Sequence, residues 1–182
     1  MKTESTVKYV LRLALTLLAI TAVVAVALAG INSITEPVIT AANEAKTQEA
    51  INAVLPGGGE AIEVPEGAYL VSAAYASETG YAVQVTPGGF DNTITMMVGV
   101  DKAGNVLGIS IISHTETAGL GAVAAASTSA GVAFRDQFVG TSGSVSVSKD
   151  GGQIDAITGA TITSRAVCDG VNAALDFVAS LG

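Results

Sequence analysis

The run from Asp155 to Ser164 concentrates side chains that could bind an anion. It combines four hydroxyl side chains with the two smallest residue types: Thr158, Thr161, Thr163, Ser164, Gly159 and Ala160. Apolar residues follow at helical spacing, so the run ends where a helix begins. The first N–H groups of a helix lack backbone partners and carry partial positive charge. The run therefore predicts a phosphate site at a helix N-terminus, with a plain N-capped turn as the alternative.

The elements on either side of this run can be predicted from pattern. Residues 153–157 are β-compatible and follow the pair Gly151-Gly152, so we expect a short strand entered from a turn. The helix after Ser164 has an apolar stripe at Val167, Val171, Ala174, Leu175 and Val178. A large side chain beside Thr161 would hinder a phosphate, or an enzyme delivering one, from reaching its hydroxyl; Gly159 and Ala160 avoid this.

The middle of the chain alternates like a set of paired strands. We expect strands at 80–86, 93–100 and 106–112, with a turn at 101–105 between the second and third. Residues 36–55 predict an amphipathic helix that ends at Pro56 and whose possible inner face is Val38, Ala42, Ala45, Ala50, Ile51 and Val54. Residues 121–133 predict a short helix and loops. The fold class is therefore α+β: one β-rich domain with a C-terminal helix, behind an N-terminal apolar segment.

That N-terminal segment is long enough to cross a membrane. Residues 13–35 form a charge-free window of 23 residues, and a helix of that length covers about 35 Å, against about 30 Å of hydrocarbon. Basic residues flank it only on the N-terminal side, which predicts a cytoplasmic tail at 1–12 and an extracytoplasmic domain at 36–182. A cleaved signal peptide is the alternative, because small residues at Ala25, Ala27 and Ala29 resemble cleavage sites.

Composition excludes several classes of function. From Glu36 onward, 15 acidic residues face five basic ones, a balance of −10, which excludes a nucleic-acid partner because such proteins need clustered cations. The lone Cys168 cannot form an intrachain disulfide, and its place on the last predicted helix indicates a small buried residue. One histidine and scattered carboxylates give no spacing typical of a metal site.

The whole string Asp-x-x-Thr-Gly-Ala-Thr-x-Thr-Ser resembles the flavinylation motif of the FMN-binding domain family. His114 to Gly121 resembles that family's "HxETPGLG" loop, with Ala118 where the family usually has proline, and residues 134–140 match a further segment. Over about the last hundred residues the chain is similar to the G subunits of Rnf electron-transport complexes. Related C subunits of the sodium-translocating NADH:quinone oxidoreductase share the motif but are generally longer.

The resemblance implies a cofactor and its attachment. It implies FMN joined by a phosphoester to Thr161, installed by a separate flavin transferase that cleaves FAD. The other contacts to the cofactor that it implies or suggests are Asp155, Thr158, Gly159, Ala160, Thr163, Ser164, Glu116, Thr117, Gly119 and Leu120. Glu116 and Thr117 are candidates for polar contacts to the flavin ring, and a turn-capping role is the alternative for Glu116.

The resemblance also implies a role in a membrane complex. Such a subunit relays electrons between ferredoxin-side and NAD-side redox centres in a translocase that moves sodium or protons, and has no independent catalytic activity. A free-standing membrane-anchored extracellular flavoprotein and a quinone-reducing complex are alternatives. A non-flavin surface scaffold is another. A hydrolase using His114, Asp155 and Ser164 is disfavoured, because nothing like a Gly-x-Ser-x-Gly elbow frames Ser164.

Overall fold

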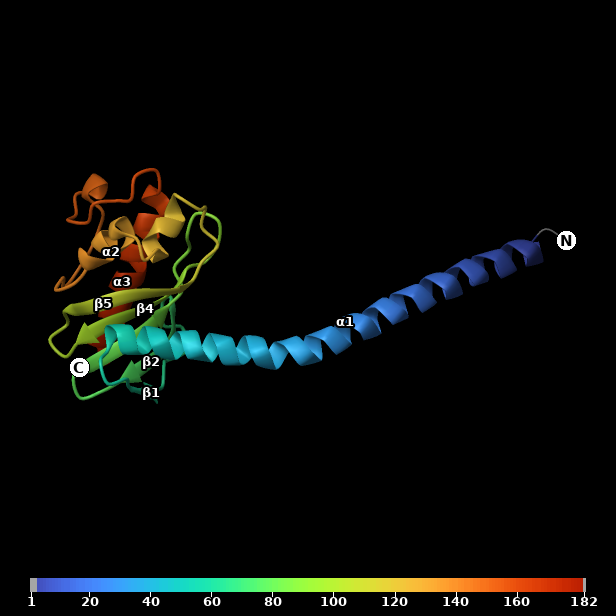
Figure 1. Cartoon of the computed structure of the whole chain (residues 1–182), viewed down its shortest axis with the longest axis horizontal. Coiled ribbons are helices and arrows are strands. Elements are labelled where there is room, and N and C mark those ends of the chain that lie inside the picture. The colour runs from blue at the N-terminus through green and yellow to red at the C-terminus, as the bar shows by residue number, and fades with distance from the viewer. Residues whose placement is uncertain (1–2, 182) are drawn as a thin grey trace. The chain divides into compact units, whose positions relative to one another are not determined.

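The computed structural model describes residues 3–181, which form helices and one five-stranded antiparallel sheet (Figure 1). The elements in chain order are α1 (Thr3–Val54), β1 (Glu60–Ile62), β2 (Val71–Ala76), β3 (Gly80–Val85), β4 (Thr95–Asp101), β5 (Val106–Ser113), the 3-10 helix η1 (Gly121–Ala125), α2 (Ser129–Asp136), the 3-10 helix η2 (Ser148–Asp150) and α3 (Thr161–Leu181). The α+β class predicted from the sequence is confirmed.

The sheet is a simple meander in which each strand pairs with the next, in the order β1-β2-β3-β4-β5. The three predicted strands correspond to β3, β4 and β5. The predicted turn joins β4 to β5 and begins at Asp101, the last residue of β4. Its carboxylate accepts hydrogen bonds from Ala103 N–H and Asn105 N–H, both at 2.8 Å. The Asn105 side chain also donates a hydrogen bond to this carboxylate and has the largest effect on it. Together these hydrogen bonds lower the pKa of Asp101. The short β1 and the alanine-rich β2 carry too weak a pattern for the sequence to single them out.

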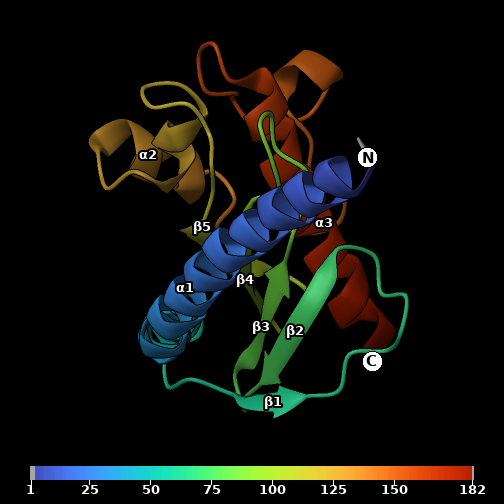
Figure 2. The ribbon, with the colours of Figure 1, turned by 90° about the vertical axis from the view of Figure 1, so that its right-hand side faces the viewer.

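Alternating residues of the sheet face two separate apolar clusters. On one face Val83, Met96 and Val98 pack with Val167 and Val171 of α3, and Figure 2 shows α3 behind β2 and β3. On the other face Ala82 and Met97 pack with residues 50–55. The period-2 alternation of a strand produces this division. The predicted apolar stripe of the last helix is confirmed, because all five of its residues are buried.

The N-terminal helix runs further than the sequence predicts. A spanning helix at 13–35 and a second helix at 36–55 are in fact one helix, α1, with Pro37 inside it. The φ of proline suits a helix, but the ring removes a backbone donor and crowds the preceding turn, so Pro37 is a local cost that α1 tolerates. Of the expected inner face of residues 36–55, Ala50, Ile51 and Val54 are buried, whereas Val38, Ala42 and Ala45 are exposed.

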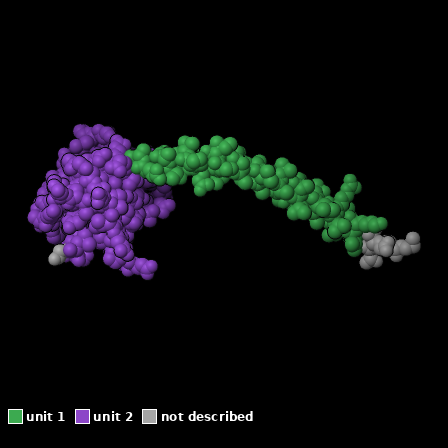
Figure 3. All heavy atoms as spheres, turned by 90° about the horizontal axis from the view of Figure 1, so that it is seen from below, with its two compact units in different colours: residues 1–45 green, residues 46–182 purple. Residues whose placement is uncertain are grey.

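Among residues 3–181, α1 is the one helix long and apolar enough to cross a membrane. Its large apolar side chains between Val7 and Ile34 are at least half exposed, as on a helix that faces lipid. The chain divides into two compact units, residues 1–45 and 46–182, coloured separately in Figure 3. The sheet, α3 and all the site residues described below belong to the second unit.

Candidate functional site

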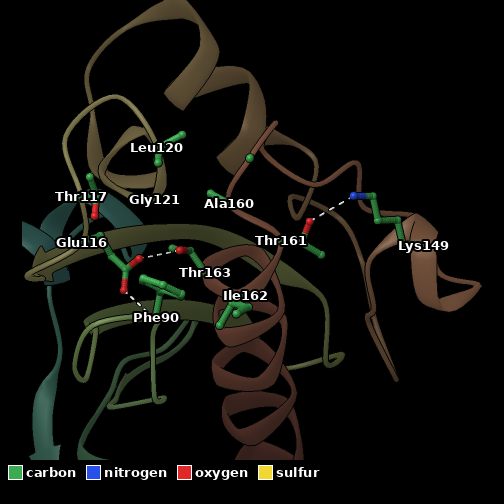
Figure 4. A pocket seen from close by; sticks show the side chains of 11 residues that line it. Phe90, Glu116, Thr117, Leu120, Gly121, Lys149, Ala160, Thr161, Ile162 and Thr163 are labelled. Atoms are coloured by element: carbon green, nitrogen blue, oxygen red, sulfur yellow. Dashed lines mark hydrogen bonds between the residues drawn. The ribbon is translucent and has the colours of Figure 1, made fainter.

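A cavity of about 350 Å³ opens at the N-terminal end of α3 (Figure 4). Its walls come from the loop before β4, the loop after β5 with the start of η1, η2, and the loop that leads into the first turn of α3. The lining residues are Phe90, Glu116, Thr117, Leu120, Gly121, Lys149, Gly159, Ala160, Thr161, Ile162 and Thr163. The structure thus brings together seven of the residues predicted for the site, from two segments about forty positions apart.

Glu116 is a buried carboxylate in the cavity wall, with 8% of its surface exposed. One of its oxygens accepts a hydrogen bond from Phe90 N–H at 2.8 Å, and the other accepts one from the Thr163 hydroxyl at 2.5 Å. Two glycines press against it, because a Cβ at Gly89 or Gly121 would overlap the carboxylate. Glu116 therefore joins three chain segments at one point, and both of its oxygens have a partner within the protein.

Thr161 lies at the first position of α3. The preceding Gly159 has a φ of +78°, a left-handed conformation that favours glycine, and its position lies under the Leu120 side chain. The turn two residues before Thr161 therefore favours glycine for its backbone conformation. The first intrahelical bond runs from Ser164 N–H to the Ala160 carbonyl, so the N–H groups of residues 161–163 precede it. The predicted start of the helix beside Thr161 is confirmed.

The strand predicted at 153–157 is wrong. The structure has one parallel β-bridge there, between Val147 and Ile154, and otherwise a loop. The backbone N–H groups that a strand would use go to side chains, with Asp155 N–H bonded to Gln137 Oε1 and Ile157 N–H bonded to Ser164 Oγ. The junction predicted to bind an anion therefore runs from a loop into a helix rather than from a strand into a helix.

Lys149 approaches Thr161 from the far side of the first turn, opposite Glu116 in Figure 4. Its Nζ donates to Thr161 Oγ1 at 3.1 Å. The next residue, Asp150, accepts two hydrogen bonds from the Arg165 guanidinium at 2.6 and 2.7 Å. This contact lowers the pKa of Asp150 and raises the pKa of Arg165.

Four predicted site residues lie outside this cavity. Asp155, Thr158 and Gly119 line a separate, more open groove beside α2. Ser164 is fully buried, and its hydroxyl donates to the Ala160 carbonyl and accepts from Ile157 N–H, so it holds the loop onto the helix.

The hydrolase arrangement gains no support from the geometry. Ser164 Oγ is bonded to two backbone groups and to neither His114 nor Asp155. His114 Nδ1 is buried and has no hydrogen-bond partner. Within residues 3–181 no group of three His, Cys, Asp or Glu side chains could hold a metal ion.

Three residues that sequence reasoning missed give the cavity its apolar and cationic character: Phe90, Ile162 and Lys149. Phe90 and Ile162 keep 67% and 49% of their surface exposed around it, beside the predicted Leu120 at 44%. An aromatic after two glycines and a lysine beside a glycine turn are sequence signals, but neither shows which cavity the side chain reaches. The result is a cavity with an apolar rim, a hydroxyl at a helix start and an ammonium beside it.

Comparison with known proteins agrees with this architecture. Residues 89–176, which contain every residue lining the cavity, match the model of the FMN-binding domain family. The chain is 32% identical, over an alignment 200 residues long, to the G subunit of the Na(+)-translocating ferredoxin:NAD(+) oxidoreductase complex of Acetobacterium woodii, covering 96% of this chain and 94% of that protein.

Shorter matches agree with this one. The chain is 32% identical to the G subunit of the ion-translocating oxidoreductase complex of Vibrio vulnificus, over 80% of this chain and 78% of that protein. It is 36% identical to the protein of the same description from Methanosarcina acetivorans, an alignment that spans 56% of this chain and 52% of that protein. The chain therefore belongs to the family of G subunits of ion-translocating oxidoreductase (Rnf) complexes.

Proposed function

We propose that this chain is the FMN-carrying redox subunit of a membrane-bound ion-translocating oxidoreductase, with FMN attached by a phosphoester to Thr161. The observation that carries the proposal is the placement of the Thr161 hydroxyl. It lies at the start of α3, on the wall of a cavity with an apolar rim, 3.1 Å from an ammonium group. A helix start of this kind favours a phosphate.

The residues present fit FMN at both of its ends. Three partly exposed apolar side chains, Phe90, Leu120 and Ile162, are a surface that a flat aromatic ring system would cover. The helix start and Lys149 suit the phosphate. When bound, FMN supplies a centre that accepts and donates electrons singly or in pairs. The chain supplies position, exclusion of water and charge.

Attachment would use the Thr161 hydroxyl as the nucleophile. Thr161 Oγ1 forms a bond to the phosphorus on the flavin side of FAD while the anhydride bond to the second phosphorus breaks. AMP leaves, and the hydroxyl proton passes to a base of the flavin transferase or to water. The partly exposed Thr161 is accessible for such a step.

We propose that residues 13–35 of α1 span the membrane, with a cytoplasmic tail at 1–12 and the domain at 36–182 outside. Outside the cytoplasm a dissociated FMN would be lost by dilution, and a covalent bond removes that loss. The anchor in turn raises the effective concentration of the flavin near membrane partners. In this setting the chain relays electrons within a complex that links ferredoxin and NAD to ion transport.

The test is to isolate the chain from its native membranes under mild detergent. We expect visible absorbance typical of a flavin, fluorescence that stays with the chain on a denaturing gel, and co-purification of integral membrane redox subunits. A coloured chain without such partners would indicate a free-standing flavoprotein, and a colourless, unmodified chain would rule out the redox role.

A further inference from the structure

Lys149 is the one basic residue among those that line the cavity. Its Nζ donates to Thr161 Oγ1, the oxygen that would carry the phosphate. The rest of the domain is acidic, with 15 acidic and five basic residues from Glu36 onward. A phosphate at Thr161 therefore adds negative charge to a surface that already repels it, and Lys149 is the cation placed to offset this.

The turn that carries Lys149 is fastened to the protein on both sides. On one side Asp150 bonds the Arg165 guanidinium, one helical turn after Thr161 on α3. On the other side Ser148 N–H donates to the Ile154 carbonyl at 2.7 Å. Gly151 closes the turn with a φ of +87°. These contacts fix the backbone of Lys149 relative to Thr161. Less conformational entropy is then lost when the Lys149 side chain binds a ligand at Thr161.

The carboxylate next to Lys149 makes its close ion pair with another cation, although it also interacts electrostatically with Lys149. Asp150, the carboxylate nearest in sequence, is paired with Arg165. The helix start contributes about half a positive charge from the same side. An ammonium and a helix N-terminus that converge on one hydroxyl form a site for a phosphate with two independent sources of positive potential.

We propose that Lys149 is the phosphate-binding residue of this site and makes the cavity select phosphorylated flavins over riboflavin. The inference rests on the proposed function in that it takes FMN as the ligand, but it does not require the covalent bond. A charge-assisted hydrogen bond to phosphate is expected to change affinity by about 10-fold or more.

The experiment measures equilibrium binding of FMN and of riboflavin, by quenching of flavin fluorescence, to the full chain in detergent. The chain is produced without flavin transferase, and its intact mass verifies that it is unmodified. We expect FMN to bind about 10-fold or more tightly than riboflavin. Lys149→Met should weaken the binding of FMN but not of riboflavin, so that the two affinities become nearly equal. Lys149→Arg should keep most of the preference for FMN. Lys102→Met, in the exposed turn after β4, is the matched control and should change neither affinity.

Three results would overturn the inference. They are equal binding of the two flavins by the unaltered chain, a Lys149→Met variant that keeps its preference for FMN, and a variant that loses both flavins equally. The last result would mean that Lys149 only shapes the cavity. Mapping of an FMN adduct in chain made with the transferase is a separate measurement. An intact preference for FMN without an adduct at Thr161 would reject the covalent bond and support the role of Lys149.

Discussion

At the scale of single residues, Glu116 acts as a structural junction in the cavity wall. Both of its oxygens are used by the protein, one by Phe90 N–H and one by the Thr163 hydroxyl. The sequence left open whether this side chain contacts the flavin ring or caps a turn. The geometry favours a positioning role, because the carboxylate ties the Phe90 loop to the first turn of α3.

We therefore expect Glu116→Gln to destabilise the protein. An amide keeps one acceptor oxygen and presents an NH₂ group where the other hydrogen bond was accepted. One buried donor is left without a partner, which costs about 1–3 kcal/mol of unfolding free energy. Chemical denaturation of the unmodified chain measures this. Glu78→Gln removes the same charge at an exposed position and should leave stability unchanged; equal effects of the two substitutions would refute the positioning role.

Cys168 should be chemically inert in the folded chain. Burial raises the pKa of its thiol to about 12 from an ordinary 9.0. The unfolded chain would release this proton near pH 9 and the folded chain would retain it, so stability falls as pH rises from about 9 to 12 and is unaffected below. At pH 8 we expect iodoacetamide to alkylate the folded chain roughly 100-fold or more slowly than the denatured chain, because reaction needs the thiolate. Rapid alkylation before unfolding would contradict this.

At the scale of elements, the contact between β4 and the end of α1 depends on a glycine. A Cβ on Gly99 would overlap the Val54 carbonyl oxygen. Gly108, its partner across the β4–β5 ladder, has nothing within 4 Å of an added Cβ.

The two glycines form a matched pair of substitutions. Gly99→Ala should lower the free energy of unfolding by about 1–3 kcal/mol, because α1 and β4 must move apart. Gly108→Ala should change it by less than about 0.5 kcal/mol. Thermal or denaturant unfolding of the two variants distinguishes them, and an equal loss from both would show that the close approach of α1 is not what constrains Gly99.

Elements were predictable from the sequence where pattern and length agree. The predictions of the three strongly alternating strands and of α3 are confirmed, because a pattern of period 2 or 3.6 shows directly which face of an element is buried. The prediction of a strand at 153–157 was wrong, because two of its backbone N–H groups donate to the side chains of Gln137 and Ser164 instead of to a neighbouring strand. A local sequence pattern does not reveal these partners. The prediction of separate helices at 13–35 and 36–55 was wrong, because Pro37 lies inside one continuous helix.

The site shows the same division between local pattern and tertiary contact. The motif at 155–164 was enough to predict Gly159, Ala160 and Thr161 as site residues. A second motif, at 114–121, was enough to predict Glu116. Lys149 and Phe90 come from other segments and reach the cavity only through the fold. Asp155 and Thr158 belong to the motif in sequence but face a different groove, since Gly159 turns the chain between them and Thr161.

At the scale of the whole molecule, the apolar part of α1 should hold the chain in the membrane. Arginine at the centre of a spanning helix costs about 2.5–3.5 kcal/mol on insertion scales. We expect the double variant Leu18→Arg, Val24→Arg to be released by alkaline carbonate, whereas Thr40→Arg, beyond the expected span, should stay in the membrane fraction. Release of the unaltered chain would argue against an anchor and for a cleaved signal peptide. Protease added outside intact spheroplasts should digest the domain, and protection there would reverse the proposed orientation.

Mass spectrometry of the intact chain tests whether FMN is bonded to one threonine oxygen. Chain produced with an active flavin transferase should carry one FMN, and fragmentation should place it on Thr161. Thr161→Val should carry none, whereas Thr158→Val, in the same motif but outside the cavity, should still be modified. An adduct that persists in Thr161→Val, or its absence from the unaltered chain, would show that Thr161 does not carry the flavin.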